Sequence, residues 1–274
     1  MKRIILLRFH KNPELVQNRI DILKYFNPEM PIYGVYGGEK KDYKKFKSAL
    51  RGLTDIIFWD EPDTDIKWRF SDESIMYWYR NLGKNLKFDI LHTVEYDLVL
   101  LGSMEELYKY SDGDRHIYIT ALVELDKIIH RSNWFNNPEF PVTECKRLVK
   151  IFNEKYGLKK LYSCMAPGTT LTREYLEGYD TVDIPLIGFD EIRLPNIAQI
   201  LEIPIKTSDF VRDWFDRTTI NFRLFNTNNH IVDIKELYQT YSTGYQKAFH
   251  HVHGFVDFNK IKKLTEKLNN NEQN

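Results

Sequence analysis

The stretch RIILLRFHKNPELVQNRIDILKYF, residues 3–26, decides the fold class of this chain. Its first part, RIILL (3–7), is a short apolar run that ends in polar residues, which is typical of a central parallel strand. The second part spaces its apolar residues at roughly helical intervals, with Asn12 predicted as the N-cap and Pro13 at the first helical position. A strand joined directly to an amphipathic helix is the first half of a strand–helix–strand unit.

The alternation of strand and helix continues outward to residue 60. The segment MPIYGVYGG (30–38) predicts a second strand that ends in a glycine turn, a lysine-rich helix follows, and DIIFWD (55–60) predicts a third strand. This order indicates parallel strands joined by right-handed crossovers. We therefore expect an α/β fold with a Rossmann-like, mostly parallel central sheet flanked by helices, in a single domain.

Later segments predict shorter elements. Residues 71–85 are predicted as a helix that Ser71 or Asp72 caps. The segment FDILHTVEYDLVLL (88–101) predicts a strand, an acidic interruption and a second strand. LYSCMAPGTTLTREYLEGY (161–179) predicts a strand, a Pro-Gly loop and a helix.

The composition argues against several classes of protein. The 274 residues carry 39 basic and 39 acidic side chains, so no net charge draws the chain to nucleic acid or an anionic membrane. Two cysteines, Cys145 and Cys164, do not make a disulfide framework, which favours a reducing compartment. The first apolar run stops at Leu7, too short for a signal peptide or a membrane span. We expect a cytoplasmic protein without a transmembrane segment.

Two carboxylates interrupt the apolar segment near residue 96. On a regular strand Glu95 and Asp97 would point to the same side. Carboxylates so close together repel each other unless a cation lies between them or one takes a proton. In parallel sheets, ligands gather beyond the carboxyl ends of the strands. The pair is therefore either a solvent-exposed strand end or a site for Mg²⁺ or Mn²⁺.

Three histidines crowd into AFHHVHG (248–254). Strand alternation would place His251 and His253 on one side and His250 on the other. Imidazole is a common ligand of divalent metals, and one histidine joining the two carboxylates is the economical functional interpretation. The alternatives are a polar surface loop or a zinc site, although no His-Glu-x-x-His motif accompanies the cluster.

Other segments offer groups for a substrate. Asp190 and Glu191 precede a predicted helix, where they are either acids favoured by the helix dipole or a general base. Thr169 and Thr170 offer hydroxyls in the predicted Pro-Gly loop. Since the sequence contains no Walker loop and no Gly-x-Gly-x-x-Gly, a phosphate would be held by a metal and basic side chains. Basic, acidic and aromatic groups that could surround a ligand are Arg8, His10, Lys67, Trp68, Arg69 and Asp72.

Taken in order, these segments resemble a glycosyltransferase of the GT-A fold, of the metal-dependent Asp-x-Asp type, over most of residues 1–258. VEYDLVLLGSMEELY (94–108) resembles the acidic motif and its short helix, with Glu95 in place of the first Asp. APGTTLTREYLE (166–177) resembles the loop near the donor sugar, and GFDEIRL (188–194) resembles the acidic segment of inverting members. HHVHG (250–254) resembles the C-terminal metal ligand. The resemblance identifies no subfamily.

The resemblance implies a UDP- or GDP-linked sugar donor, bound through its diphosphate to Mn²⁺ or Mg²⁺, and attack by an acceptor hydroxyl. The acceptor would be a glycan, a lipid-linked molecule or a protein. Inversion is expected, with Asp190 or Glu191 as the base. The expected metal ligands are Asp97, Glu95, His251 and His253. The expected donor contacts are Arg8, His10, Lys67, Arg69, Asp72, Glu95, Tyr96, Thr169 and Thr170.

One catalytic domain is expected over residues 1–258, with a nucleotide-binding half to about residue 100, an acceptor half over about 101–258, and a helix with a polar tail at 259–274. A nucleotidyltransferase or sugar-nucleotide pyrophosphorylase is the main alternative, but it would show a glycine-rich basic loop after the first strand, which RFHKNPELV (8–16) lacks. A non-catalytic binding protein of the same fold is the third interpretation.

Overall fold

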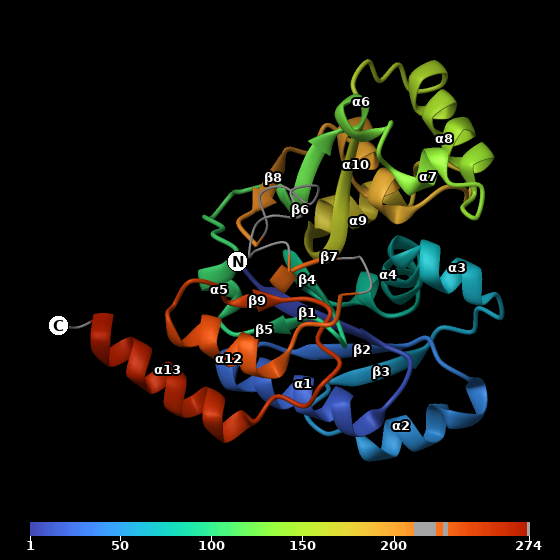
Figure 1. The fold of residues 1–274 in the computed structure, drawn as a ribbon. Helices are drawn as coiled ribbons and strands as arrows, with labels where there is room; N and C mark the ends of the chain where they lie inside the picture. Colours follow the sequence, from blue (N-terminus) through green and yellow to red (C-terminus); the bar gives the residue numbers. More distant parts are fainter. Residues whose placement is uncertain (211–222, 227–229, 273–274) are drawn as a thin grey trace. The chain divides into compact units, whose positions relative to one another are not determined.

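The computed structural model describes residues 1–210, 223–226 and 230–272 (Figure 1). The chain folds as two compact units. Unit 1 consists of Met1–Arg3, Trp59–Thr93 and Ser111–Thr207. Unit 2 consists of Ile4–Phe58, Val94–Tyr110 and Ser208–Asn274. Each unit draws on residues before and after position 100, so the chain passes between them more than once.

The strands confirm the expected α/β class with a mostly parallel central sheet. Seven strands follow the order β3-β2-β1-β4-β7-β6-β8, and a separate pair is formed by β5 and β9. The strands are β1 (Arg3–Phe9), β2 (Ile32–Tyr36), β3 (Asp55–Phe58), β4 (Ile90–Glu95), β5 (Val99–Leu100), β6 (Ile117–Glu124), β7 (Tyr162–Thr172), β8 (Ile205–Ser208) and β9 (Ala248–Phe249). β1, β2 and β3 pair in parallel, whereas β7 is antiparallel to β4 and β6.

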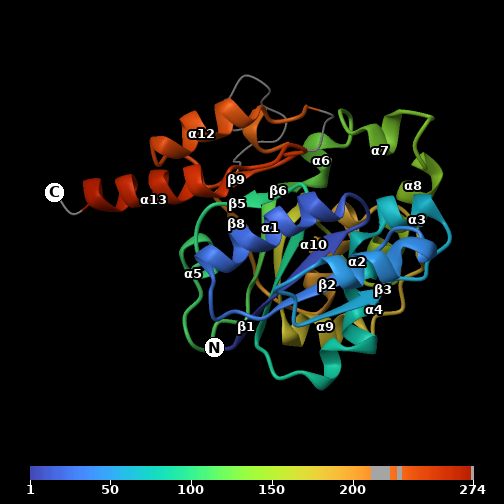
Figure 2. The same cartoon turned by 90° about the horizontal axis from the view of Figure 1, so that it is seen from below.

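Unit 2 begins as the sequence predicts. Helices α1 (Pro13–Phe26) and α2 (Tyr43–Ala49), the latter preceded by a turn of 3₁₀ helix, η1 (Lys40–Asp42), lie on one face of β1–β3 (Figures 1 and 2). The backbone N–H of Leu15 donates to Asn12 Oδ1 at 3.1 Å, so Asn12 caps α1 as expected.

The later part of unit 2 packs onto α1. Its helices are α5 (Met104–Leu107), α12 (Ile234–Ser242) and α13 (Phe258–Glu272). One apolar cluster joins Ile22 of α1 to Leu237 of α12 and Ile261 of α13. This burial fixes the C-terminal segments against the first helix of the unit.

Unit 1 places helices around β4, β6, β7 and β8. They are α3 (Thr64–Arg69), α4 (Ser71–Asn81), η2 (Gly83–Asn85), α6 (Leu125–Ile128), α7 (Asn133–Asn136), α8 (Val142–Glu154), α9 (Arg173–Tyr179) and α10 (Asp190–Ile200). Trp78, Phe152 and Tyr175 are among the largest fully buried side chains. None of the helices within the described residues combines the length and the apolar composition needed to cross a membrane.

Two local predictions for unit 1 are wrong. The Pro-Gly loop does not exist, because β7 runs through Pro167 and Gly168 without a break. Gly168 adopts a φ of 74°, and the pairing of β6 with β7 shifts register twice, so an irregular strand absorbs the pair. Helix α4 is not capped by Ser71 or Asp72; its N-cap is Phe70. The Asp72 carboxylate instead binds Arg193.

Candidate metal centre

The acidic motif lies in a turn at the end of β4. The strand ends at Glu95, and the N–H of Leu98 donates to the Glu95 carbonyl at 3.0 Å. The Tyr96 N–H donates to the carbonyl of Arg8 at 3.0 Å, which anchors the turn to β1. Because Asp97 is in this turn, the regular strand alternation that we assumed does not apply. The turn still brings both carboxylates into one cluster, as expected.

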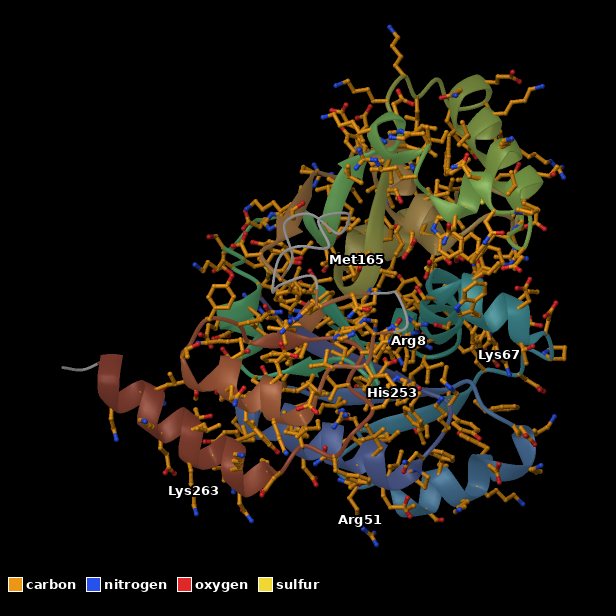
Figure 3. The ribbon with its side chains drawn as sticks, in the orientation of Figure 1. Arg8, Arg51, Lys67, Met165, His253 and Lys263 are labelled. Atoms are coloured by element: carbon orange, nitrogen blue, oxygen red, sulfur yellow. The ribbon has the colours of Figure 1, made fainter. Side chains whose placement is uncertain are left out.

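The histidine segment approaches the same turn from the far end of the sequence. The N–H of Val252 donates to the carbonyl of Asp97 at 2.8 Å. His253 Nε2 lies 3.6 Å from Asp97 Oδ2, and His250 Nε2 lies 3.7 Å from both Asp97 Oδ1 and Glu95 Oε2. The two oxygens of Asp97 therefore face different histidines. Figure 3 labels His253 and also Arg8, which is on β1.

His250 is the most buried of the three histidines, with 1% of its surface exposed. Its Nδ1 lies 2.5 Å from the carbonyl oxygen of Asn226. A carbonyl only accepts hydrogen bonds, so Nδ1 carries the proton and Nε2 is directed at Glu95 and Asp97. Such fixing of the ring by a backbone carbonyl is characteristic of metal-binding histidines.

The charges of this cluster depend on one another. Burial raises the pKa of Asp97, but the contact with His253 and the charges of His250 and His251 hold that pKa well below its usual range. Burial lowers the pKa of His250, yet Glu95 and Asp97 together raise it above its ordinary value. Burial and the charge of His250 lower the pKa of His251 to about 4. At neutral pH Asp97 is thus ionised and His251 is neutral, and these are the forms that bind a cation.

The rim of the cluster is cationic and aromatic. Arg8 donates to Glu95 Oε1 at 2.9 Å. Burial raises the pKa of Glu95, but the charge of Arg8 and the contact with His250 together lower it below its ordinary value. The His10 ring meets the Tyr96 ring edge-on, with centroids 4.9 Å apart, and Lys11 Nζ lies 5.7 Å from the centroid of the same ring. Four of the predicted contacts, Arg8, His10, Glu95 and Tyr96, therefore adjoin Asp97.

These residues fit a divalent cation. Asp97 Oδ1 and His250 Nε2 are buried, and neither has a hydrogen-bond partner among the described residues. Donor atoms of Asp97, His250 and His251 lie within 4.8 Å of one another. In octahedral coordination, adjacent ligand atoms are roughly 3 Å apart and opposite ones roughly 4 Å. Two imidazoles beside one carboxylate favour Mn²⁺ over Mg²⁺, which prefers oxygen ligands.

Strand alternation predicted that His250 would point away from His251 and His253, yet His250 has the best position of the three for binding a metal with Asp97. The assumption failed because β9 ends at Phe249, so residues 250–254 do not alternate as a strand. The sequence did contain a signal, since all three histidines stand in the segment. Nothing in the sequence pointed to Asn226, whose backbone carbonyl orients the ring.

The acidic pair of unit 1 lies at the start of α10. Asp190 accepts the backbone N–H groups of Ser71 at 3.1 Å and Glu191 at 2.7 Å. Glu191 Oε2 accepts the indole N–H of Trp134 at 2.7 Å. Each of the two acids is 6% exposed. Asp190 therefore joins two segments of backbone, whereas Glu191 is held by a side chain.

An aromatic cluster adjoins Glu191 in unit 1. Trp134 stacks on Phe189 with ring centroids 3.6 Å apart, and both lie within 6 Å of the Trp68 ring. Trp68 is 60% exposed, which is unusual for so large an apolar side chain. The cluster therefore places aromatic rings beside Glu191 and is exposed to solvent at Trp68.

The remaining predicted contacts are in unit 1, where most have structural partners. Asp72 is 1% exposed and accepts from Arg193 Nε at 2.6 Å and the Tyr179 hydroxyl at 2.5 Å. Arg69 forms ion pairs with Asp65 at 2.8 Å and Glu144 at 2.6 Å.

The two predicted threonines are inside the sheet. Thr169 and Thr170 are buried within β7, and the Thr169 hydroxyl donates to the carbonyl of Ala166 at 2.7 Å. Lys67 is half-buried on α3 (Figure 3). Asp72, Arg69 and the threonines thus have roles in packing unit 1 that the sequence did not reveal.

No protein-family profile matches this sequence, and no curated protein matches it. Among solved structures, the chain is similar to the galactosyltransferase LgtC in complex with donor and acceptor sugar analogues, at 14% identity, covering 75% of this chain and 72% of that one, with a TM-score of 0.39.

The chain is also similar to a cytidylyltransferase from Leptospira borgpetersenii serovar Hardjo-bovis (strain JB197), at 12% identity. The match covers 100% of this chain and 96% of that one, with a TM-score of 0.45. The bifunctional glycosyltransferase WbbM is similar at 9% identity. The match covers 97% of this chain and 51% of that one, with a TM-score of 0.43. With identities of 14% or less and TM-scores below 0.5, these similarities establish neither a family nor an activity for this chain.

Proposed function

We propose that this chain is a glycosyltransferase that uses a divalent metal, Mn²⁺ or Mg²⁺, to transfer a sugar from a UDP- or GDP-linked donor to an acceptor hydroxyl. One observation carries the proposal. Asp97 Oδ1 and His250 Nε2, both buried and without a hydrogen-bond partner among the described residues, lie 3.7 Å apart. A proton or a cation must lie between two such acceptors, since their lone pairs repel each other. The position of the pair, at the end of β4, is where ligands of open α/β sheets gather.

The proposed metal ligands are Asp97, His250 and His251. Glu95 has a supporting role, because its two oxygens face Arg8 and His250 rather than open space. His253 is the outermost of the three histidines and contacts the second oxygen of Asp97. This assignment keeps Asp97 and His251 from the ligands expected from the sequence, replaces His253 with the buried His250, and leaves Glu95 as a supporting residue.

The donor diphosphate would bind beside this centre. When bound, the cation supplies compensation for the negative charge that grows on the leaving nucleoside diphosphate. Arg8 and Lys11 add positive charge at the same edge. Burial and the charge of Lys11 lower the pKa of His10, so this ring is neutral at pH 7 and can hydrogen-bond a phosphate or ribose oxygen. Glycans, lipid-linked molecules and proteins are the proposed classes of acceptor.

Thermal stability in the presence of metal and nucleotide tests this function. We expect Mn²⁺ with UDP or with GDP to raise the melting temperature, whereas either nucleotide with EDTA should have little effect. A ligand at 100 times its Kd stabilises the folded state by about 2.7 kcal/mol. Incubation with nucleotide sugars should then release nucleoside diphosphate only when metal is present. Release of pyrophosphate from a nucleoside triphosphate and a sugar phosphate would instead identify a nucleotidyltransferase, and no response to any nucleotide would overturn the proposal.

Glu191 is the proposed base of an inverting reaction. The Glu191→Gln variant should reduce kcat by about 10²–10⁴-fold, the usual contribution of a general base, with little change in the donor KM. Asp190→Asn is the matched control, because Asp190 is occupied by two backbone N–H groups; it should lower stability and keep most of kcat. Steady-state kinetics of both variants would decide. A Glu191→Gln enzyme with wild-type kcat would rule out this base.

A further inference from the structure

Arg19 is a buried cation in the middle of α1. It is 1% exposed, and burial lowers its pKa to about 10, so it remains charged at neutral pH. A buried guanidinium is costly unless its N–H groups are all satisfied. The side chain faces the metal centre of unit 2, and no feature of the sequence marked it.

The hydrogen bonds of Arg19 go to the two segments that form the metal centre. Its Nε donates to the carbonyl of Tyr96 at 3.0 Å. One terminal nitrogen donates to the carbonyls of Val252 at 2.8 Å and Gly254 at 2.9 Å. The other donates to Asn18 Oδ1 at 2.6 Å. Tyr96 immediately precedes the proposed ligand Asp97, and Val252 immediately follows the ligand His251.

This geometry fixes the separation of the ligands. Guanidinium is planar and presents its donors in a rigid fork, so three carbonyls bound to it cannot move independently. The direct bond from the Val252 N–H to the Asp97 carbonyl adds a second constraint. The two segments are far apart in the sequence and share no regular strand pairing at the ligands themselves. Arg19 therefore bonds to the backbone next to both Asp97 and His251.

We propose that Arg19 is a positioning residue for the metal centre, which sets the distance between Asp97 and the histidine segment and so the affinity for the cation. The inference rests on the proposed function in one respect, that a metal binds at Asp97. Partners outside the first coordination sphere commonly contribute about 10–100-fold in metal affinity. Arg19 would make such a contribution through carbonyls rather than through the ligand side chains.

The test compares Mn²⁺ affinity in three proteins by isothermal titration calorimetry, well below their melting temperatures. Arg19→Gln should bind Mn²⁺ about 10–100-fold more weakly than wild type. Arg19→Lys keeps the positive charge but not the planar set of donors, and should bind Mn²⁺ nearly as weakly as Arg19→Gln. Asn27→Ala is the matched control, because Asn27, the C-cap of α1, also bonds to a distant backbone group: it accepts the N–H of Met104 at 2.7 Å, away from the centre. It should be less stable than wild type but bind Mn²⁺ normally.

Chemical rescue separates positioning from general stability. In Arg19→Ala, millimolar guanidinium chloride should restore Mn²⁺ affinity, and ammonium chloride at the same ionic strength should not. If wild type binds Mn²⁺ and Arg19→Gln binds it within twofold of wild type, the positioning role is wrong and the proposed function stands. If wild type itself binds no Mn²⁺, the proposed function and this inference both fail. Equal losses in Arg19→Gln and Asn27→Ala would also overturn the positioning role.

Discussion

The Asp97→Asn variant is expected to lose Mn²⁺ binding and nearly all metal-dependent sugar transfer while remaining folded. Asp97 is the only proposed ligand with oxygen donors, and its two oxygens face His250 and His253. An amide of nearly the same shape keeps the packing but supplies no negative charge to the cation. Metal catalysis contributes several kcal/mol to such reactions, so the loss corresponds to roughly 10³-fold in kcat or more.

The measurements are Mn²⁺ titration, circular dichroism and release of nucleoside diphosphate from the preferred donor. Asp21→Asn is a suitable control, since Asp21 is an exposed carboxylate on α1 of the same unit. It should match wild type in all three measurements. If the Asp97→Asn variant retained full metal-dependent activity, the centre at the end of β4 would not be the catalytic one.

Asp72→Ala should lower the free energy of unfolding by about 3–5 kcal/mol, the usual cost of leaving a buried charge without its partner. Asp72 and Arg193 are each 1% exposed, and their ion pair measures 2.6 Å. Burial lowers the pKa of Arg193, but Asp72 and Tyr179 together raise it above its ordinary value. Without Asp72 the buried guanidinium would lose its main partner and still keep its charge, because arginine does not lose its proton in proteins. Urea denaturation, followed by tryptophan fluorescence or circular dichroism, would measure this change in the free energy of unfolding.

An exposed ion pair gives the comparison for Asp72. Arg80 and Asp180 lie 2.6 Å apart, with side chains 41% and 44% exposed. Asp180→Ala should therefore change the free energy of unfolding by about 1 kcal/mol or less. If Asp72→Ala were as stable as wild type and instead bound the donor more weakly, the sequence-based assignment of Asp72 as a donor contact would be right.

The sequence predicts the first 60 residues well because each signal there is local. Asn12, Pro13 and the helical spacing of apolar residues are read within one or two turns of α1. The Pro-Gly pair of β7 misled us for the same reason. A local rule reads Pro167 and Gly168 as a turn, while pairing with two neighbouring strands holds them in the sheet.

The sequence predicted those parts of the candidate site that depend on residue type and on where strands end. Glu95, Asp97 and the histidine segment meet as expected, because strand ends and charge patterns are visible in the sequence. Which of the three histidines lies best for a metal could not be predicted, because it depends on where β9 ends and on the Asn226 carbonyl. Asp72 and Arg69 are polar residues near a predicted ligand side, but their partners Arg193 and Glu144 come from distant segments.

The hydrogen bond from Arg19 to the Val252 carbonyl has a consequence for biosynthesis. The two residues are 233 positions apart. At roughly 5–20 residues per second, the ribosome needs about 10–50 s to make the intervening chain. Until then Arg19 lacks two of its acceptors, the carbonyls of Val252 and Gly254, and Asp97 has no histidines beside it. We therefore expect that the proposed metal centre cannot form until residues 250–254 have left the ribosome, which would place metal binding at a late stage of translation.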